Sequence, residues 1–379
     1  IAESPQKKGT ASLMARMLMA GTLKQKFRKL NDRLESIGAS LGFGAGELNI
    51  SFGGQCLRED LPKLLQILQE VLDQPSFPPA QFERYKMQTL TVLAIQAEDT
   101  YDQADKAFNR LFYGRHPYAL PLLGTEESIA TLTRDDLVEF HEQYLGPQGM
   151  VLSIVGGIDP VQAAKICEST LGGWQRPQQQ PLPDLPEFFP PQQTLQEHIP
   201  LEEKSQTDLI VGTLSPETMS RAYYAASVGN NILGQFGMMG RLGNSVREKA
   251  GLAYGIQSEL GGGVGPSPWL ISAGVNPSNL DKAVKLILKE LERFITSPVS
   301  QRELANARTQ MVGRLPISLE SNAGIAQALL SMERYSLSLD YFKELPGLLA
   351  SITAEEILNA AKASWHLDRL VIASAGSTR

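Results

Sequence analysis

The chain is poor in the residues that form disulfides and bind metals. Its 379 residues contain only two cysteines, Cys56 and Cys167, and four histidines. Two cysteines make at most one bridge, so a disulfide-stapled scaffold is excluded and the redox compartment stays open. No two histidines lie within ten residues of each other, so the helical histidine pair typical of zinc hydrolases is absent.

The chain also lacks a positive charge excess and a long apolar run. It has 35 Lys plus Arg against 41 Asp plus Glu, a net charge of −6, which argues against a nucleic-acid partner. The most apolar run, 150–158, is far shorter than the roughly 20 residues of a membrane span, and residues 1–8 do not resemble a signal peptide. We therefore expect a soluble globular protein, and a cytoplasmic, periplasmic or organellar location remains open.

Proline is concentrated in one segment. Residues 175–200 contain seven of the 23 prolines and little periodic apolar pattern. Proline stiffens an extended chain and blocks helix formation, so this segment is predicted to be a semi-rigid linker. It separates a first domain, 1–174, from a second domain, 201–379.

The two halves resemble each other. Residues 132–140 align with 352–360, and at the same offset 151–156 align with 371–376. The second pair is rich in β-branched residues and is predicted to form a buried strand in each half. The sequence therefore indicates an internal duplication.

Each copy also has the same helix start. Thr133 is followed three residues later by Asp136, and Thr353 by Glu356, a spacing that caps the free backbone donors of a first helical turn. With the strands, this predicts an α+β fold in which helices pack against a sheet in each half.

One segment of the second half places two chemically useful side chains close together in sequence. A helix-like stretch ends near Gly251 and is followed by a predicted strand, 252–258. Arg247 falls in the last helical turn and Tyr254 on the strand, and a guanidinium beside a phenol can bind and polarise a carbonyl group. The residues alone favour a structural role, with the arginine at the negative end of a helix dipole and the tyrosine packed in a sheet.

The motif at 247–254, Arg-Glu-Lys-x-Gly-Leu-Ala-Tyr after a glycine-rich turn, resembles the C-terminal domain of the M16 (pitrilysin-type, inverzincin) metallopeptidases. Gly-Arg-His-Pro-Tyr at 114–118 and Gly-Thr-Glu-Glu-Ser-Ile at 124–129 extend the resemblance along the chain. It implies two homologous α+β domains, each with a mixed or antiparallel sheet. It also implies that Arg247 and Tyr254 are the paired residues that the family directs at a substrate.

The zinc-binding helix of that family has lost its ligands here. Its frame, Gly-x-Ala-His-x-x-Glu-His-Met-Leu, places Ser12 and Arg16 at the two histidine positions and Ala15 at the position of the general-base glutamate. The distal acidic ligand falls near Val92. These side chains cannot hold Zn²⁺ or activate its water, so the resemblance implies no metal and no cofactor on this chain.

The resemblance thus predicts a non-catalytic, substrate-binding subunit of a heterodimeric M16-type zinc peptidase. The expected partners are a zinc-bearing M16 subunit and an unfolded peptide, with Arg247 and Tyr254 contributed to the partner's active site and no peptidase activity from this chain alone. Family domains normally have strands before the helix at 9–22, so the first domain is expected to lack its early strands.

Two other functions stay open. The chain could be a purely structural or assembly subunit, like the core proteins of a respiratory complex, with no role in proteolysis. It could also be a homodimeric peptide-binding module.

Overall fold

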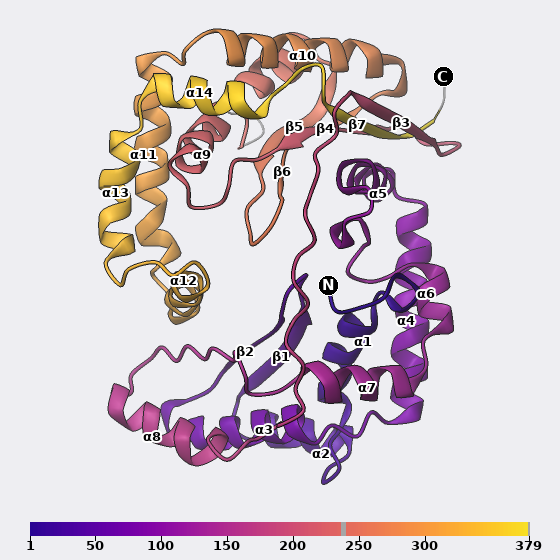
Figure 1. Ribbon diagram of the computed structural model, residues 1–379, viewed down its shortest axis with the longest axis vertical. Coiled ribbons are helices and arrows are strands. Elements are labelled where there is room, and N and C mark those ends of the chain that lie inside the picture. The colour runs from indigo at the N-terminus through magenta and orange to yellow at the C-terminus, as the bar shows by residue number, and fades with distance from the viewer. Residues whose placement is uncertain (236–239, 378–379) are drawn as a thin grey trace. The chain divides into compact units, whose positions relative to one another are not determined.

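The computed structural model describes residues 1–235 and 240–377 (Figure 1). Part of the glycine-rich turn before Arg247, residues 236–239, therefore lies outside the described residues. The α-helices are α1 (Thr10–Met17), α2 (Phe27–Glu35), α3 (Leu61–Asp73), α4 (Pro79–Ala97), α5 (Thr100–Tyr113), α6 (Glu126–Thr131), α7 (Arg134–Tyr144), α8 (Pro160–Leu171), α9 (Arg221–Leu233), α10 (Leu280–Thr296), α11 (Gln301–Ser318), α12 (Asn322–Arg334), α13 (Tyr341–Ser351) and α14 (Ala354–Ser364). The strands are β1 (Ser40–Ala45), β2 (Ile50–Gln55), β3 (Leu195–Pro200), β4 (Thr207–Leu214), β5 (Ala253–Leu260), β6 (Pro268–Val275) and β7 (Val371–Gly376).

The predicted α+β class is confirmed, and the chain forms two compact units. Unit 1 comprises Ile1–Ile95, Leu120–Leu185 and Ile325–Leu330, and unit 2 comprises the rest. Residues 96–119, which include α5, thus belong to unit 2 although they lie in the first half of the sequence. Within the described ranges, no helix is both long and apolar enough to cross a membrane.

Unit 1 is built mostly from helices around a short hairpin. Strands β1 and β2 are antiparallel, with Phe43 opposite Phe52, and both rings pack against an apolar core. Helices α1 and α3 contribute buried Met14, Leu65 and Leu68 to that core. The apolar stripe of α3 follows the helical period, which is why one side of this helix is buried.

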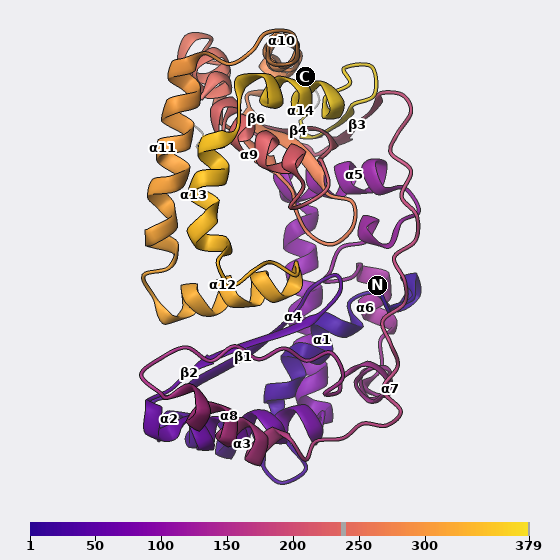
Figure 2. The same cartoon turned by 60° about the vertical axis from the view of Figure 1, so that its left-hand side comes forward.

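Unit 2 contains a mixed five-stranded sheet in the order β3-β7-β4-β6-β5. β3 and β7 are parallel, and the other neighbours are antiparallel. Successive residues of β4 point to opposite faces: Leu209 and Val211 join a core that includes α9, α10 and α14, whereas Ile210 joins a core with α5. In Figure 1, α5 lies along the sheet near β3 and β7, where it packs Phe108 and Phe112 against that second face. Figure 2 shows α11 and α13 side by side on another part of unit 2.

The predicted helix starts are confirmed. Thr133 Oγ1 accepts the backbone N–H of Asp136 at the start of α7, and Thr353 Oγ1 accepts that of Glu356 at the start of α14. In both helices the acidic side chain in turn accepts the backbone N–H of its threonine, so two otherwise unpaired donors are satisfied.

One of the two predicted strands is wrong. Residues 371–376 form β7, but the matching run 151–155 has no regular secondary structure. β7 is hydrogen-bonded on both sides, to β3 and β4, whereas no described strand pairs with 151–155. Its apolar side chains Leu152 and Ile154 still pack against the unit 1 core. The last residues of the predicted linker, Leu195–Pro200, form β3 at the edge of the sheet.

Candidate functional site

Arg247 lies in a π-helix, Gly243–Lys249, just before β5. This wide helical form is rare and often occurs at functional positions. The carbonyl of Arg247 accepts the N–H of Gly251 at 3.0 Å, and Gly251, with φ +62°, takes the left-handed conformation that ends the helix. The side chain is one-third exposed, and its Nε lies 4.0 Å from Glu248 Oε1, too far for a hydrogen bond. The guanidinium is therefore accessible.

Tyr254 is the extra residue of a β-bulge. Ala253 pairs with Val275 and Gly255 pairs with Gly274, so Tyr254 has no partner on β6. The bulge turns the tyrosine out of the sheet, and its side chain is 87% exposed. β5 is also the outer strand of the sheet and packs against the π-helix that carries Arg247. The two predicted residues thus lie on adjoining elements of unit 2.

The outer edge of β5 is available only in part. At Ser258 the backbone N–H donates to the carbonyl of Gly234 at 3.0 Å, and Asn230 Nδ2 donates to the Ser258 carbonyl at 3.4 Å. Asn230 is itself fixed by Trp269 Nε1, which donates to its Oδ1 at 2.8 Å. A chain segment that pairs with β5 must therefore do so at the end near Tyr254.

A partly buried ion pair anchors the helical segment that carries Arg247. Arg241 Nε donates to Glu303 Oε1 at 2.7 Å and Nη2 donates to Oε2 at 3.0 Å, a two-pronged arrangement that fixes direction as well as distance. The Arg241 side chain is only 8% exposed and lies against Phe294. The hydrogen bonds from Arg241 lower the pKa of Glu303 from 4.5 to about 2. This pair holds the start of the segment to α11.

The residues at the lost zinc-ligand positions have other roles. Ser12 Oγ donates to the carbonyl of Leu122 at 2.7 Å, and Ala15 is fully buried. Arg16 Nη2 donates to Gln88 Oε1 at 3.0 Å, and its guanidinium carbon lies 4.9 Å from the centre of the Tyr85 ring. One hydroxyl, one methyl group and one cation do not form a Zn²⁺ ligand set, so the metal implied by the family does not fit here.

Within residues 1–235 and 240–377, no group of three or more His, Cys, Asp or Glu side chains is arranged so that it could hold a metal ion. At the fourth position, Val92 is 40% exposed on α4. The contact of Arg16 with Tyr85 and Gln88 was missed at the sequence level. The sequence did indicate this contact, because residues 85, 88 and 92 share one face of a helix and residue 92 aligns with the distal acidic ligand of the family's zinc site.

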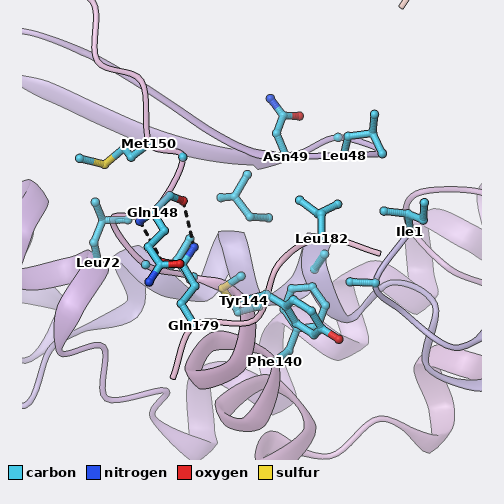
Figure 3. Close-up of a pocket in the computed structure, with 18 of the residues that line it drawn as sticks. Ile1, Leu48, Asn49, Leu72, Phe140, Tyr144, Gln148, Met150, Gln179 and Leu182 are labelled. Carbon is cyan, nitrogen blue, oxygen red and sulfur yellow. Dashed lines mark hydrogen bonds between the residues drawn. The ribbon is translucent and has the colours of Figure 1, made fainter. Parts of the chain in front are cut away.

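Unit 1 also contains an apolar cavity of about 200 Å³, shown in Figure 3. Phe140, Tyr144 and Leu182 line one part of it. Gln148 and Gln179 lie in another part, where the backbone N–H of Gln148 donates to Gln179 Oε1 at 3.0 Å and Gln179 Nε2 donates to the Gln148 carbonyl at 3.1 Å. These polar groups satisfy each other, and the cavity holds no arrangement of an acid, a base and a nucleophile.

Comparisons with known proteins identify relatives over most of the chain. Residues 1–126 match the family "Insulinase (Peptidase family M16)", and residues 131–311 match "Peptidase M16 inactive domain". An uncharacterized zinc protease of Bacillus subtilis is 25% identical over 319 residues, which cover 84% of this chain and 76% of that protein.

Solved structures share the fold. The peptidase M16 inactive domain from Pseudomonas fluorescens is 27% identical, with a TM-score of 0.89 over 98% of this chain and 89% of that one. A chain of Complex III2 from Candida albicans, 16% identical, has a TM-score of 0.79 over 99% of this chain and 88% of that one.

Proposed function

This chain belongs to the M16 peptidase family, and from that premise we propose that it is the non-catalytic, peptide-binding subunit of a peptidase made of two different M16 chains. The zinc chemistry belongs to the partner, because Ser12, Ala15 and Arg16 offer no metal site on this chain. We expect this chain alone to hydrolyse no peptide. We also expect it to increase turnover by a zinc-bearing partner.

The exposure of Tyr254 carries this proposal. A large aromatic side chain that is 87% exposed, on a bulge at an outer strand, contributes little to folding. Bulges often direct a side chain toward a functional site, and an outer strand offers backbone groups that can pair with an extended peptide. Arg247, on the adjoining π-helix, adds an accessible cation. A subunit with a purely structural role has no need of this combination.

The two side chains have distinct roles in the proposal. A peptide segment lies along the Tyr254 end of β5, since the Ser258 end is already occupied. Arg247 donates to a peptide carbonyl and fixes the position of the segment. The Tyr254 hydroxyl donates to the carbonyl oxygen that gains negative charge during amide hydrolysis. Losing one such donor lowers turnover by about 10²–10³-fold.

The test uses the complex of this chain with a partner that carries the His-x-x-Glu-His helix. Turnover of an unfolded peptide is measured for complexes that contain the wild-type chain, Tyr254→Phe or Arg247→Ala. Tyr101→Phe on α5, where the side chain is 43% exposed, and Arg293→Ala on α10, where it is 65% exposed, are matched controls. We expect the first two variants to lose about 10²–10³-fold in turnover with unchanged complex formation, and the controls to retain it.

Two results would contradict the proposal. Full activity of a complex with the Tyr254→Phe, Arg247→Ala double variant would leave the chain an architectural role only. Chelator-sensitive peptide hydrolysis by this chain alone would show that it carries its own catalytic metal.

A further inference from the structure

Two arginines of unit 1 lie against one tyrosine ring. The guanidinium carbon of Arg16, on α1, is 4.9 Å from the centre of the Tyr85 ring, and that of Arg84, on α4, is 5.8 Å from it. Attraction between a cation and an aromatic face favours both positions, and the planar guanidinium is suited to this contact. Two permanent positive charges therefore lie within 6 Å of the centre of the Tyr85 ring.

The charge gathered there is not neutralised within the described part of the chain. Arg16 Nη2 donates to the neutral side chain of Gln88, and neither Arg16 nor Arg84 forms an ion pair with a described carboxylate. A guanidinium has five N–H groups, so most of the donors of Arg16 remain for another acceptor. Gln88 and Tyr85 hold the group in a fixed direction, which lowers the entropy cost of binding.

Apolar side chains continue from Tyr85 along one face of α4. Tyr85, Gln88, Val92 and Ile95 follow the helical spacing of three and four residues and therefore share one face. Val92 is 40% exposed and Ile95 is 66% exposed, which is unusual for two aliphatic residues one turn apart. The surface thus consists of a cationic end and an apolar strip.

We propose that Arg16 and Arg84 form a binding site for a peptide carboxylate, and that an apolar side chain next to that carboxylate lies on Val92 and Ile95. This rests on the proposed function, since it assumes that the chain binds peptides. The carboxylate is either the C-terminal group of the peptide or an Asp or Glu side chain, because both match the two-pronged geometry of a guanidinium. A cation thus occupies a ligand position of the family's zinc site, and there it selects acidic peptides.

A simpler role for Arg16 is a mechanical one. Its hydrogen bond to Gln88 ties α1 to α4, and this contact alone could explain an arginine at that position. That role predicts an effect of Arg16 on stability and none on peptide selection. The mechanical role also leaves Arg84 without a function, because Arg84 and Tyr85 lie on the same helix.

The experiment measures binding of fluorescein-labelled unfolded peptides to the full chain by anisotropy. Four versions of one apolar peptide are compared: free C-terminus, C-terminal amide, amide with an internal Glu, and amide with an internal Gln. The variants are Arg16→Met and Arg84→Met, with Arg28→Met as the control, since Arg28 is an exposed arginine of α2 in the same unit. Arg28→Met removes the same charge from the chain, so it corrects for long-range electrostatics.

We expect Arg16→Met and Arg84→Met each to weaken binding of a carboxylate-bearing peptide about tenfold, which corresponds to about 1.4 kcal/mol. Binding of the amide–Gln peptide and the Arg28→Met variant should be unchanged. The free-acid and Glu peptides distinguish the two sources of the carboxylate, and a preference for either supports the site. Raising the salt concentration should reduce the preference.

Other outcomes overturn the inference. One result refutes the carboxylate site and leaves the proposed function intact: all four peptides bind with equal affinity, Tyr254→Ala weakens their binding, and Arg16→Met does not. A lower melting temperature for Arg16→Met with unchanged peptide affinity assigns Arg16 the mechanical role. Failure of the wild-type chain to bind any of the peptides counts against both proposals.

Discussion

Helices α11 and α14 of unit 2 both begin with a glutamate that caps the helix and pairs with an arginine, but the two arginines differ in exposure. The two pairs therefore allow a matched test of how much burial of the arginine adds to the free energy of unfolding. Glu303 caps α11 through Ser300 and accepts two hydrogen bonds from Arg241. Glu356 caps α14 through Thr353 and accepts one hydrogen bond from Arg221. Hydrogen bonds from these arginines are the largest cause of a low pKa, about 2, at both glutamates.

The two pairs differ in exposure. The Arg241 side chain is 8% exposed, whereas that of Arg221 is 44% exposed. Glu303→Gln keeps an oxygen for the helix cap but places an NH₂ group against an Arg241 nitrogen and leaves a buried cation without its partner. A fall in pKa from 4.5 to about 2 sets a ceiling of about 3.4 kcal/mol, and the partial exposure of Glu303 reduces this to roughly 2 kcal/mol. Glu356→Gln should cost no more than about 0.5–1 kcal/mol, as is typical of exposed ion pairs.

The pH dependence follows from the direction of the shift. Because the pKa of Glu303 is lower in the folded chain, its contribution is complete above about pH 4.5 and is lost as the pH falls toward 2. The difference in free energy of unfolding between wild type and Glu303→Gln should therefore shrink over that range.

Chemical denaturation followed by tryptophan fluorescence measures these effects. In a Trp174→Phe background, the signal comes only from Trp269 and Trp365, which are both buried in the core of unit 2. Equal destabilisation by Glu303→Gln and Glu356→Gln would show that burial of the arginine does not set the strength of the pair. A pH-independent difference for Glu303→Gln would refute the assignment of the low pKa.

Three further predictions concern other parts of the chain. Burial lowers the pKa of His141 from 6.5 to about 4, so unit 1 should lose stability as the pH falls from 6.5 to 4. His141→Gln can still donate to the Leu72 carbonyl but does not titrate. Acid unfolding of this variant should therefore lack the loss of stability between pH 6.5 and 4. Gly212→Ala should destabilise unit 2 by about 1–3 kcal/mol in thermal unfolding, because the new Cβ would lie 2.5 Å from a Phe108 ring carbon, whereas Gly53→Ala, with open space around it, is the mild control. Purified chain incubated with Zn²⁺ and desalted should retain no stoichiometric metal by elemental analysis, and one tightly held ion per chain would refute our account of α1.

Local features of the fold could be predicted from the sequence. The starts of α7 and α14 depend on a threonine and an acid three residues apart, and that interaction needs nothing from the rest of the chain. The order of a helical segment followed by a strand around Arg247 and Tyr254 was also predicted from the local sequence. The bulge and the π-helix were not, because each adds backbone geometry that residue types do not specify.

Features that depend on distant partners could not be predicted. The runs 151–155 and 371–376 are similar in sequence, yet among the strands of residues 1–235 and 240–377 only the second run has neighbours to pair with. The periodicity of α5 predicts a helix with a buried face, but it does not tell which sheet will cover that face. The site around Tyr85 likewise depends on the packing of α1 against α4.

The position of α5 limits how this protein can be divided. A fragment that begins at residue 201 would keep β4, β5, β6 and β7 but lose Phe108 and Phe112, which shield one face of those strands. We expect this fragment to expose a broad apolar surface and to aggregate, even though the linker at 175–200 looks like a suitable domain boundary for truncation. Any truncation meant to isolate the Tyr254 region must therefore carry residues 96–119 with it, by fusion or by co-expression.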